Sequence, residues 1–148
     1  MTKHKVEEIT LTGQGKSIEQ AFSNTALNMF SIVTDPSKVS PAQRKSIMLR
    51  SKDLKNLLYL FLKKLYDLAS NDLFLLNEVK DVVIEDINNE YLLTAVAYGD
   101  KLSNHEIKDI VKQCTDRNIS IKEDKDGCKI QINLVVERRI LDKEEDEV

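Results

Sequence analysis

"ITLTGQGKSIEQAF" (residues 9–22) is the stretch in which the spacing of apolar residues changes. Up to residue 12, apolar and polar side chains alternate loosely, which is typical of a strand. From Ser17 onward, apolar side chains recur at steps of three and four, which places them on one face of a helix. The stretch therefore predicts a strand over residues 3–12 that leads through a short turn into a helix.

The same stretch contains Gly-Lys-Ser, the end of a phosphate-binding loop, and so raises the question of a nucleotide site. Such a loop also needs a glycine five positions earlier, where this chain has Thr10. Ser17 and Gln20 instead have the spacing of a helix capping box, and Gly13 and Gly15 fit a tight turn. We interpret the stretch as a turn and a helix cap, with a nucleotide site as the minor alternative.

The rest of the chain predicts a second helix and several strands. The first helix ends by Thr34, because the following Asp35-Pro36 disfavours helical backbone. A strand over 44–51 and an amphipathic helix over about 52–69 come next. The remaining pattern is that of sheet: a short apolar piece at 73–76, strands over 79–85, 91–98, 118–123 and 128–136, and a segment at 106–113 that fits either a helical turn or an irregular strand.

Two dipeptides, Asn88-Asn89 and Asp126-Gly127, indicate hairpin turns between these strands. The order of elements predicts an α+β fold in which two amphipathic helices pack on one or two largely antiparallel sheets. Residues 1–141 are expected to form a single domain. The acidic tail, residues 142–148, is expected to be mobile.

Composition limits the classes of function. The chain has 148 residues and a net charge of -3, so it lacks the overall basic field that independent tight binding to RNA or DNA requires. No apolar run follows the basic N-terminus, and no run is long enough to span a bilayer. These features predict a soluble cytoplasmic protein without a membrane contact.

Few residues suggest chemistry by themselves. Cys114 and Cys128 lack zinc-binding spacing and are interpreted as reduced, partly buried thiols, with a disulfide as the alternative. His4 and His105 are interpreted as surface or loop residues rather than as an acid–base pair. No nucleophile motif is present. From the residues alone, the inference stops at a soluble α+β domain.

Three segments have a familiar order along the chain: "GKSIEQAFSNTALNMFSIVTD" (15–35), "SKDLKNLLYLFLKKLYDLASNDLFL" (51–75) and "YLLTAVAYGDKLSNHEIKDIVK" (91–112). Together they resemble the archease family: the first is similar to its first helix, the second to its second helix, and the third to its Ala-x-Ala-Trp-Gly-Glu strand and the His-Glu-x-Lys segment after it. The resemblance runs from about Glu8 to about residue 135, and the second-helix segment and the Ala-Val-Ala-Tyr-Gly run are its most specific parts.

This resemblance implies a small accessory protein of the RNA-splicing ligase, the enzyme that joins tRNA exon halves after intron removal. Such a protein activates the ligase by promoting its guanylylation and turnover and is not itself a catalyst. The family implies acidic residues and a bound divalent cation, calcium or magnesium, at the place where the accessory protein meets the ligase.

The family's acidic positions carry over in part. Counting back from the glycines places Glu8 at the acid of the first strand, one methylene longer than the family's aspartate. The second-helix aspartate matches Asp53, for which helix capping is an equal alternative. The last-strand aspartate falls on Val135, so we expect either weakened metal binding or a site rebuilt with Asp142 or Glu137. The resemblance thus implies metal ligands at Glu8, Asp53 and Asp142, with cation binding weakened by the lost carboxylate.

A second hypothesis is a degenerate archease-fold protein that serves as an interaction or chaperone-like module without a working metal site. The family's His-Thr-Ala-Asp is missing from the first strand, and the C-terminal aspartate is displaced. A small hydrolase that uses His105 is a weaker alternative, because no arrangement of nucleophile and base accompanies it.

Overall fold

The computed structural model describes residues 2–141 of the chain. The tail predicted to be mobile, residues 142–148, lies outside the described residues. The elements follow in the order β1 (Thr2–Gly15), α1 (Ile18–Val33), the 3-10 helix η1 (Pro36–Lys38), β2 (Gln43–Ser51), α2 (Leu54–Asn71), β3 (Phe74–Ile87), β4 (Glu90–Lys101), the 3-10 helix η2 (Leu102–Asn104), β5 (Ile110–Cys114), β6 (Ser120–Asp124) and β7 (Gly127–Leu141).

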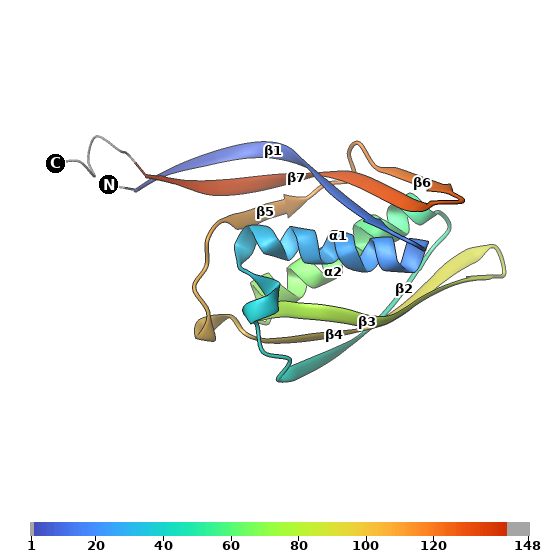
Figure 1. The fold of residues 1–148 in the computed structure, drawn as a ribbon, viewed down its shortest axis with the longest axis horizontal. Coiled ribbons are helices and arrows are strands. Elements are labelled where there is room, and N and C mark those ends of the chain that lie inside the picture. Colours follow the sequence, from blue (N-terminus) through green and yellow to red (C-terminus); the bar gives the residue numbers. More distant parts are fainter. Residues whose placement is uncertain (1, 142–148) are drawn as a thin grey trace.

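The strands form two antiparallel sheets with both helices between them (Figure 1). One sheet has the order β1-β7-β5, with β6 also paired to β7, and the other has the order β2-β4-β3. Helix α1 packs against β1, β7 and β3, and α2 packs against β2, β3 and β5. The predicted α+β fold with two helices on antiparallel sheets is therefore confirmed, and within residues 2–141 each sheet has one face that no helix covers.

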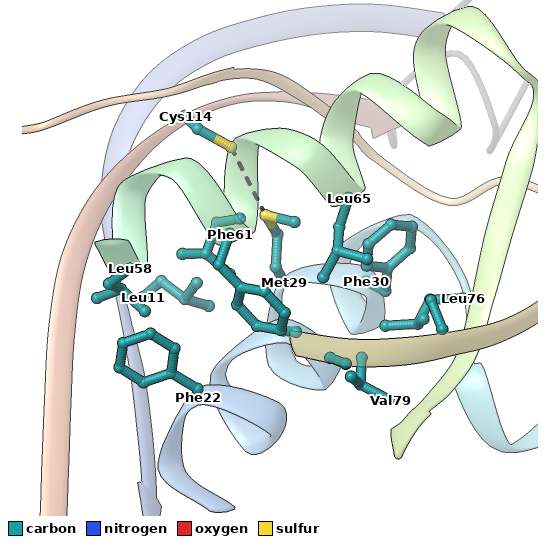
Figure 2. Packing of buried hydrophobic residues seen from close by; sticks show 14 of the residues in the cluster. Leu11, Phe22, Met29, Phe30, Leu58, Phe61, Leu65, Leu76, Val79 and Cys114 are labelled. Atoms are coloured by element: carbon teal, nitrogen blue, oxygen red, sulfur yellow. Dashed lines mark hydrogen bonds between the residues drawn. The ribbon is translucent and has the colours of Figure 1, made fainter. Parts of the chain in front are cut away.

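Both helices contribute to one core between the sheets (Figure 2). The rings of Phe22 on α1 and Phe61 on α2 lie 5.8 Å apart between centroids, and both side chains are fully buried. Met29 and Leu65 fill the space beside them. Burial of an aliphatic or aromatic side chain of this size contributes about 1.5–3 kcal/mol, so the core is the main source of stability.

The start of α1 confirms the capping interpretation. The Gln20 backbone N–H donates to Ser17 Oγ at 3.1 Å, and the Lys16 backbone N–H donates to Gln20 Oε1 at 2.6 Å. The side chain of Gln20 therefore satisfies a donor one residue before the cap rather than that of the cap itself.

The turn interpretation of Gly13 and Gly15 is wrong. Both glycines lie in β1, and neither has a positive φ. A Cβ added to Gly13 would clash with Thr25 Oγ1 and would lie 2.7 Å from Thr25 Cα, and one added to Gly15 would lie 2.7 Å from the Ala21 backbone nitrogen. The glycines are needed because α1 lies directly against β1, and they leave room for that contact.

Three predicted boundaries also change. The pieces at 73–76 and 79–85 form the single strand β3, which has register shifts between Leu76 and Glu78 and between Lys80 and Val83. The ambiguous segment 106–113 is resolved in favour of a strand, β5. The second hairpin turn is one residue earlier than predicted, because Gly127 already pairs with Asp124.

We expect Gly13→Ala to destabilise the fold by about 1–3 kcal/mol, because the new methyl group meets the backbone of α1 as well as a side chain. Urea unfolding of the variant and of the wild type measures this change. Gln14→Ala, at the exposed neighbouring position, is the matched control and should change the unfolding free energy little. Equal midpoints for all three proteins would show that α1 can move away from β1 without loss.

Candidate functional site

A polar cluster on the free face of the β1-β7-β5 sheet surrounds Glu8. Both carboxylate oxygens of Glu8 are engaged: Asn133 Nδ2 donates to Oε2 at 2.6 Å, and Arg117 Nη2 lies 2.9 Å from Oε1. Thr10 Oγ1 donates to Asn133 Oδ1 at 3.2 Å and so fixes the orientation of the Asn133 amide. Alternation along β1 turns Glu8 and Thr10 outward, away from the buried Leu11.

Hydrogen bonds to the backbone of Arg117 hold this residue beside Glu8. It lies in the connection between β5 and β6, where the Asn133 N–H donates to Arg117 O at 3.0 Å. Thr115 Oγ1 accepts from the Arg117 N–H at 3.2 Å and donates to Asn133 O at 2.6 Å. We call Glu8, Thr10, Thr115, Arg117 and Asn133 the Glu8 cluster. Its hydrogen bonds fasten the loop to β7 and leave the Arg117 side chain 57% exposed and the Glu8 side chain 36% exposed.

The remaining candidate metal ligands have the following places in the structure. Asp53 is the N-cap of α2, and its carboxylate accepts from the Asn56 N–H at 2.7 Å, as the capping alternative predicts. The carboxylate of Glu137 lies near two basic side chains: Oε1 is 3.9 Å from His4 Nδ1, and Oε2 is 3.8 Å from Lys112 Nζ. Asp142 lies outside the described residues.

The donor set for a divalent cation is therefore incomplete. Among residues 2–141, no three His, Cys, Asp or Glu side chains come together where they could hold a metal ion. Val135, where the resemblance places the family's last aspartate, is the direct register partner of Glu8 on β7. An aliphatic side chain thus occupies the place beside Glu8 from which a second carboxylate would come, and the described residues alone do not fit a cation.

Sequence reasoning missed Arg117, Thr115 and Asn133 as members of this site. It also missed the pair formed by His105 and Asp100, in which His105 Nε2 lies 3.0 Å from Asp100 Oδ2. The hydrogen bond from His105 holds the pKa of the Asp100 carboxyl below its usual value. This pair fastens η2 to the end of β4.

The two cysteines are free and buried, so the disulfide alternative is wrong. Cys114 Sγ lies 3.8 Å from Met29 Sδ inside the core (Figure 2). Burial raises the pKa of the Cys114 thiol to about 12, and the nearby Asp67 acts in the same direction. A thiol in this state is not a nucleophile at neutral pH.

No helix among the described residues is long and apolar enough to cross a membrane.

These features define a class: a small α+β protein whose two helices lie between two antiparallel sheets, with a polar cluster on the open face of one sheet. The chain belongs to the archease family, because the model of the Archease protein family (MTH1598/TM1083) matches residues 8–136. The resemblance noted in the sequence is therefore confirmed.

Individual relatives agree with this assignment. Protein archease of Saccharolobus islandicus is 33% identical over 122 residues, which cover 81% of this chain and 86% of the relative. Protein archease of Thermococcus kodakarensis is 34% identical over 122 residues, covering 81% and 85%. The solution structure of Methanobacterium thermoautotrophicum protein 1598 matches with a TM-score of 0.69 and 27% identity, over 90% of this chain and 96% of that one.

The raised pKa of Cys114 predicts a pH dependence of stability. The native state keeps the thiol protonated to about pH 12, whereas the unfolded state loses the proton near 9.0. Between these values the unfolded state binds fewer protons, so this thiol lowers the unfolding free energy by about 1.4 kcal/mol for each pH unit of increase. Denaturant unfolding of the wild type and of Cys114→Val across this window measures the difference in slope. Parallel pH profiles would show that the thiol ionises equally in both states.

Proposed function

We propose that this chain is an accessory protein of the RNA-splicing (tRNA) ligase that promotes guanylylation and turnover of the enzyme in the cytoplasm. Its membership of the archease family over residues 8–136 is the observation that carries this proposal. The net charge of -3 is compatible with a protein partner and gives no overall attraction to an RNA backbone. In this proposal the chain is not a catalyst.

The Glu8 cluster is the surface that we assign to the ligase contact. It lies on a sheet rather than on a free loop, and its hydrogen bonds hold the carboxylate in one orientation. A fixed, partly exposed carboxylate can orient a basic or hydrogen-bonding group of the ligase near the nucleotide site. Asp53 provides a second exposed carboxylate and at the same time caps α2.

The proposal has two forms. In the first, calcium or magnesium binds through Glu8, Asp53 and Asp142, and this ligand set stays a prediction. In the second, the chain acts as an archease-fold interaction or chaperone-like module without a cation. The contact between Arg117 and Glu8 favours the second form, because a guanidinium and a divalent cation compete for the same carboxylate.

We expect the wild-type chain to increase the rate at which the ligase is guanylylated by GTP. The double variant Glu8→Gln and Asp53→Asn should lose stimulation on the order of tenfold, equivalent to a charged contact of about 1.4 kcal/mol. Asparagine is as good an N-cap as aspartate, so the second change removes charge without removing the cap. Formation of the labelled ligase–nucleotide adduct is the measurement.

Glu123→Ala, at an exposed position on β6, is the control and should keep full stimulation. No stimulation by the wild type would contradict the proposed function itself. Full stimulation by the double variant would leave the function but remove Glu8 and Asp53 from it.

A cation titration separates the two forms. We expect the melting temperature of the wild type to change little with calcium or magnesium, because both Glu8 oxygens are already engaged. A cation that binds only the folded chain must raise that temperature with concentration. A clear rise in the wild type that is lost in Glu8→Gln would establish the metal-binding form instead.

A further inference from the structure

The β2-β4-β3 sheet has an uncovered face that is organised in rows. Within the described residues, the helices cover one face of this sheet and leave the other open (Figure 1). Side chains on the covered face, such as Ile47, Leu93 and Ala97, are buried, and alternation turns their neighbours outward. The outward residues, which we call the β2-β4-β3 outer face, pair across the three strands as Arg44–Tyr98–Glu78, Ser46–Val96–Lys80, Met48–Thr94–Val83 and Arg50–Leu92–Glu85.

The middle of this face is apolar. Met48 is 68% exposed and Val83 is 41% exposed, which are high fractions for large hydrophobic side chains. Thr94 stands between them in the same row, and Leu92 and Val96 lie on either side of Thr94 along the central strand and are partly exposed. A contiguous apolar patch with a polar rim marks an interaction surface.

The two edge strands end the first and last rows with opposite charges. The edge strand β2 carries Arg44 and Arg50, and the opposite edge strand β3 carries Glu78 and Glu85. Glu78 lies 3.3 Å from Lys80 Nζ on its own strand. Among the described residues, no ion pair involves either arginine or Glu85. Within the described residues, the row Arg50–Leu92–Glu85 therefore has an unpaired positive charge at its β2 end and an unpaired negative charge at its β3 end.

We propose that the β2-β4-β3 outer face binds a second copy of this chain, around a twofold axis that runs along β4. Rotation about such an axis places β2 of one copy over β3 of the other, row upon row. Arg50 then faces Glu85 of the second copy, Arg44 faces Glu78, and Met48 faces Val83. Ser46 faces Lys80, so no row brings like charges together.

The charge pattern selects this axis over its alternative. A twofold axis across the strands places β2 over β2 and sets Arg44 against Arg50, and on the other edge it sets Glu78 against Glu85. Like charges that face each other across an interface oppose association. The axis along β4 instead sets each arginine against a glutamate and places the exposed apolar side chains Met48 and Val83 against each other.

The size of the face predicts a dimer that depends on concentration. With strands about 4.8 Å apart and about 3.3 Å of rise per residue, a three-stranded face as long as β2 has a flat footprint of roughly 400 Å². Stable complexes bury about 800 Å² per partner, so this interface belongs to the weak end of the range. The Glu8 cluster lies on the other sheet and stays open in both copies, so the dimer does not depend on the proposed ligase contact.

Sedimentation velocity of the full chain, at concentrations spanning about two orders of magnitude, tests the proposal. We expect the wild type to shift from monomer to dimer. Arg50→Glu alone and Glu85→Arg alone should each weaken the dimer by on the order of tenfold or more, because each sets like charges against each other. An equimolar mixture of these two variants should recover association, since each variant then offers the other a complementary row on both sides of the axis.

Both positions are exposed, and circular dichroism checks that the variants stay folded. Lys122→Glu, an equal change of charge at an exposed position on β6, should leave the dimer unchanged. A wild type that stays monomeric over the whole concentration range would overturn the proposal. Protection of this face from amide hydrogen exchange that appears only when the ligase is added would also overturn it. A dimer that is indifferent to both single variants, or a mixture that does not recover association, would place the contact elsewhere.

Discussion

The pairing of the first strand with the last is the constraint on which the rest of the structure depends. β1 and β7 are paired without a register shift from Thr2 with Leu141 to Gly15 with Cys128. This ladder joins the two ends of the described chain and closes the sheet that covers α1. Its register also decides which side chains meet on the outer face: it sets Glu8 beside Val135 and Thr10 beside Asn133. A slip by one residue would turn the Glu8 side chain into the core and Leu11 into solvent.

Placing both helices between two sheets determines where polar chemistry can lie. A helix covered on two sides needs a wide apolar surface, and α2 buries six of its residues, from Leu57 to Leu68. The space between the sheets is therefore filled by apolar side chains. Burial there raises the pKa of the Cys114 thiol and keeps the thiol neutral. The two outer faces remain for interactions. One presents the fixed Glu8 cluster, and the other presents arginines on β2 and glutamates on β3 around a partly apolar centre.

Local features of the fold could be predicted from the sequence, whereas contacts between distant segments could not. Ser17 and Asp53 indicate the two helix starts, because a capping pattern lies within four residues. Asn88-Asn89 indicates a hairpin turn, and both residues have positive φ. The role of Gly13 was misjudged because close packing against Thr25 leaves no trace in local sequence. Glu8 could be found by counting from the glycines, but its partner Asn133 is 125 residues away and depends on the β1–β7 register.

Arg117 provides a positively charged partner for Glu8, the acidic position that the family resemblance identifies in the first strand. A divalent cation needs several converging anions, and the neighbouring register position holds Val135 instead of an acid. A guanidinium has no such need, because one carboxylate balances its charge and its planar donors match carboxylate geometry. Three hydrogen bonds of the loop, made by Thr115 and Asn133, already hold Arg117 in position. In the form of the proposal without a cation, the protein therefore provides its own positive charge beside Glu8, and Asn133 and Arg117 orient the carboxylate.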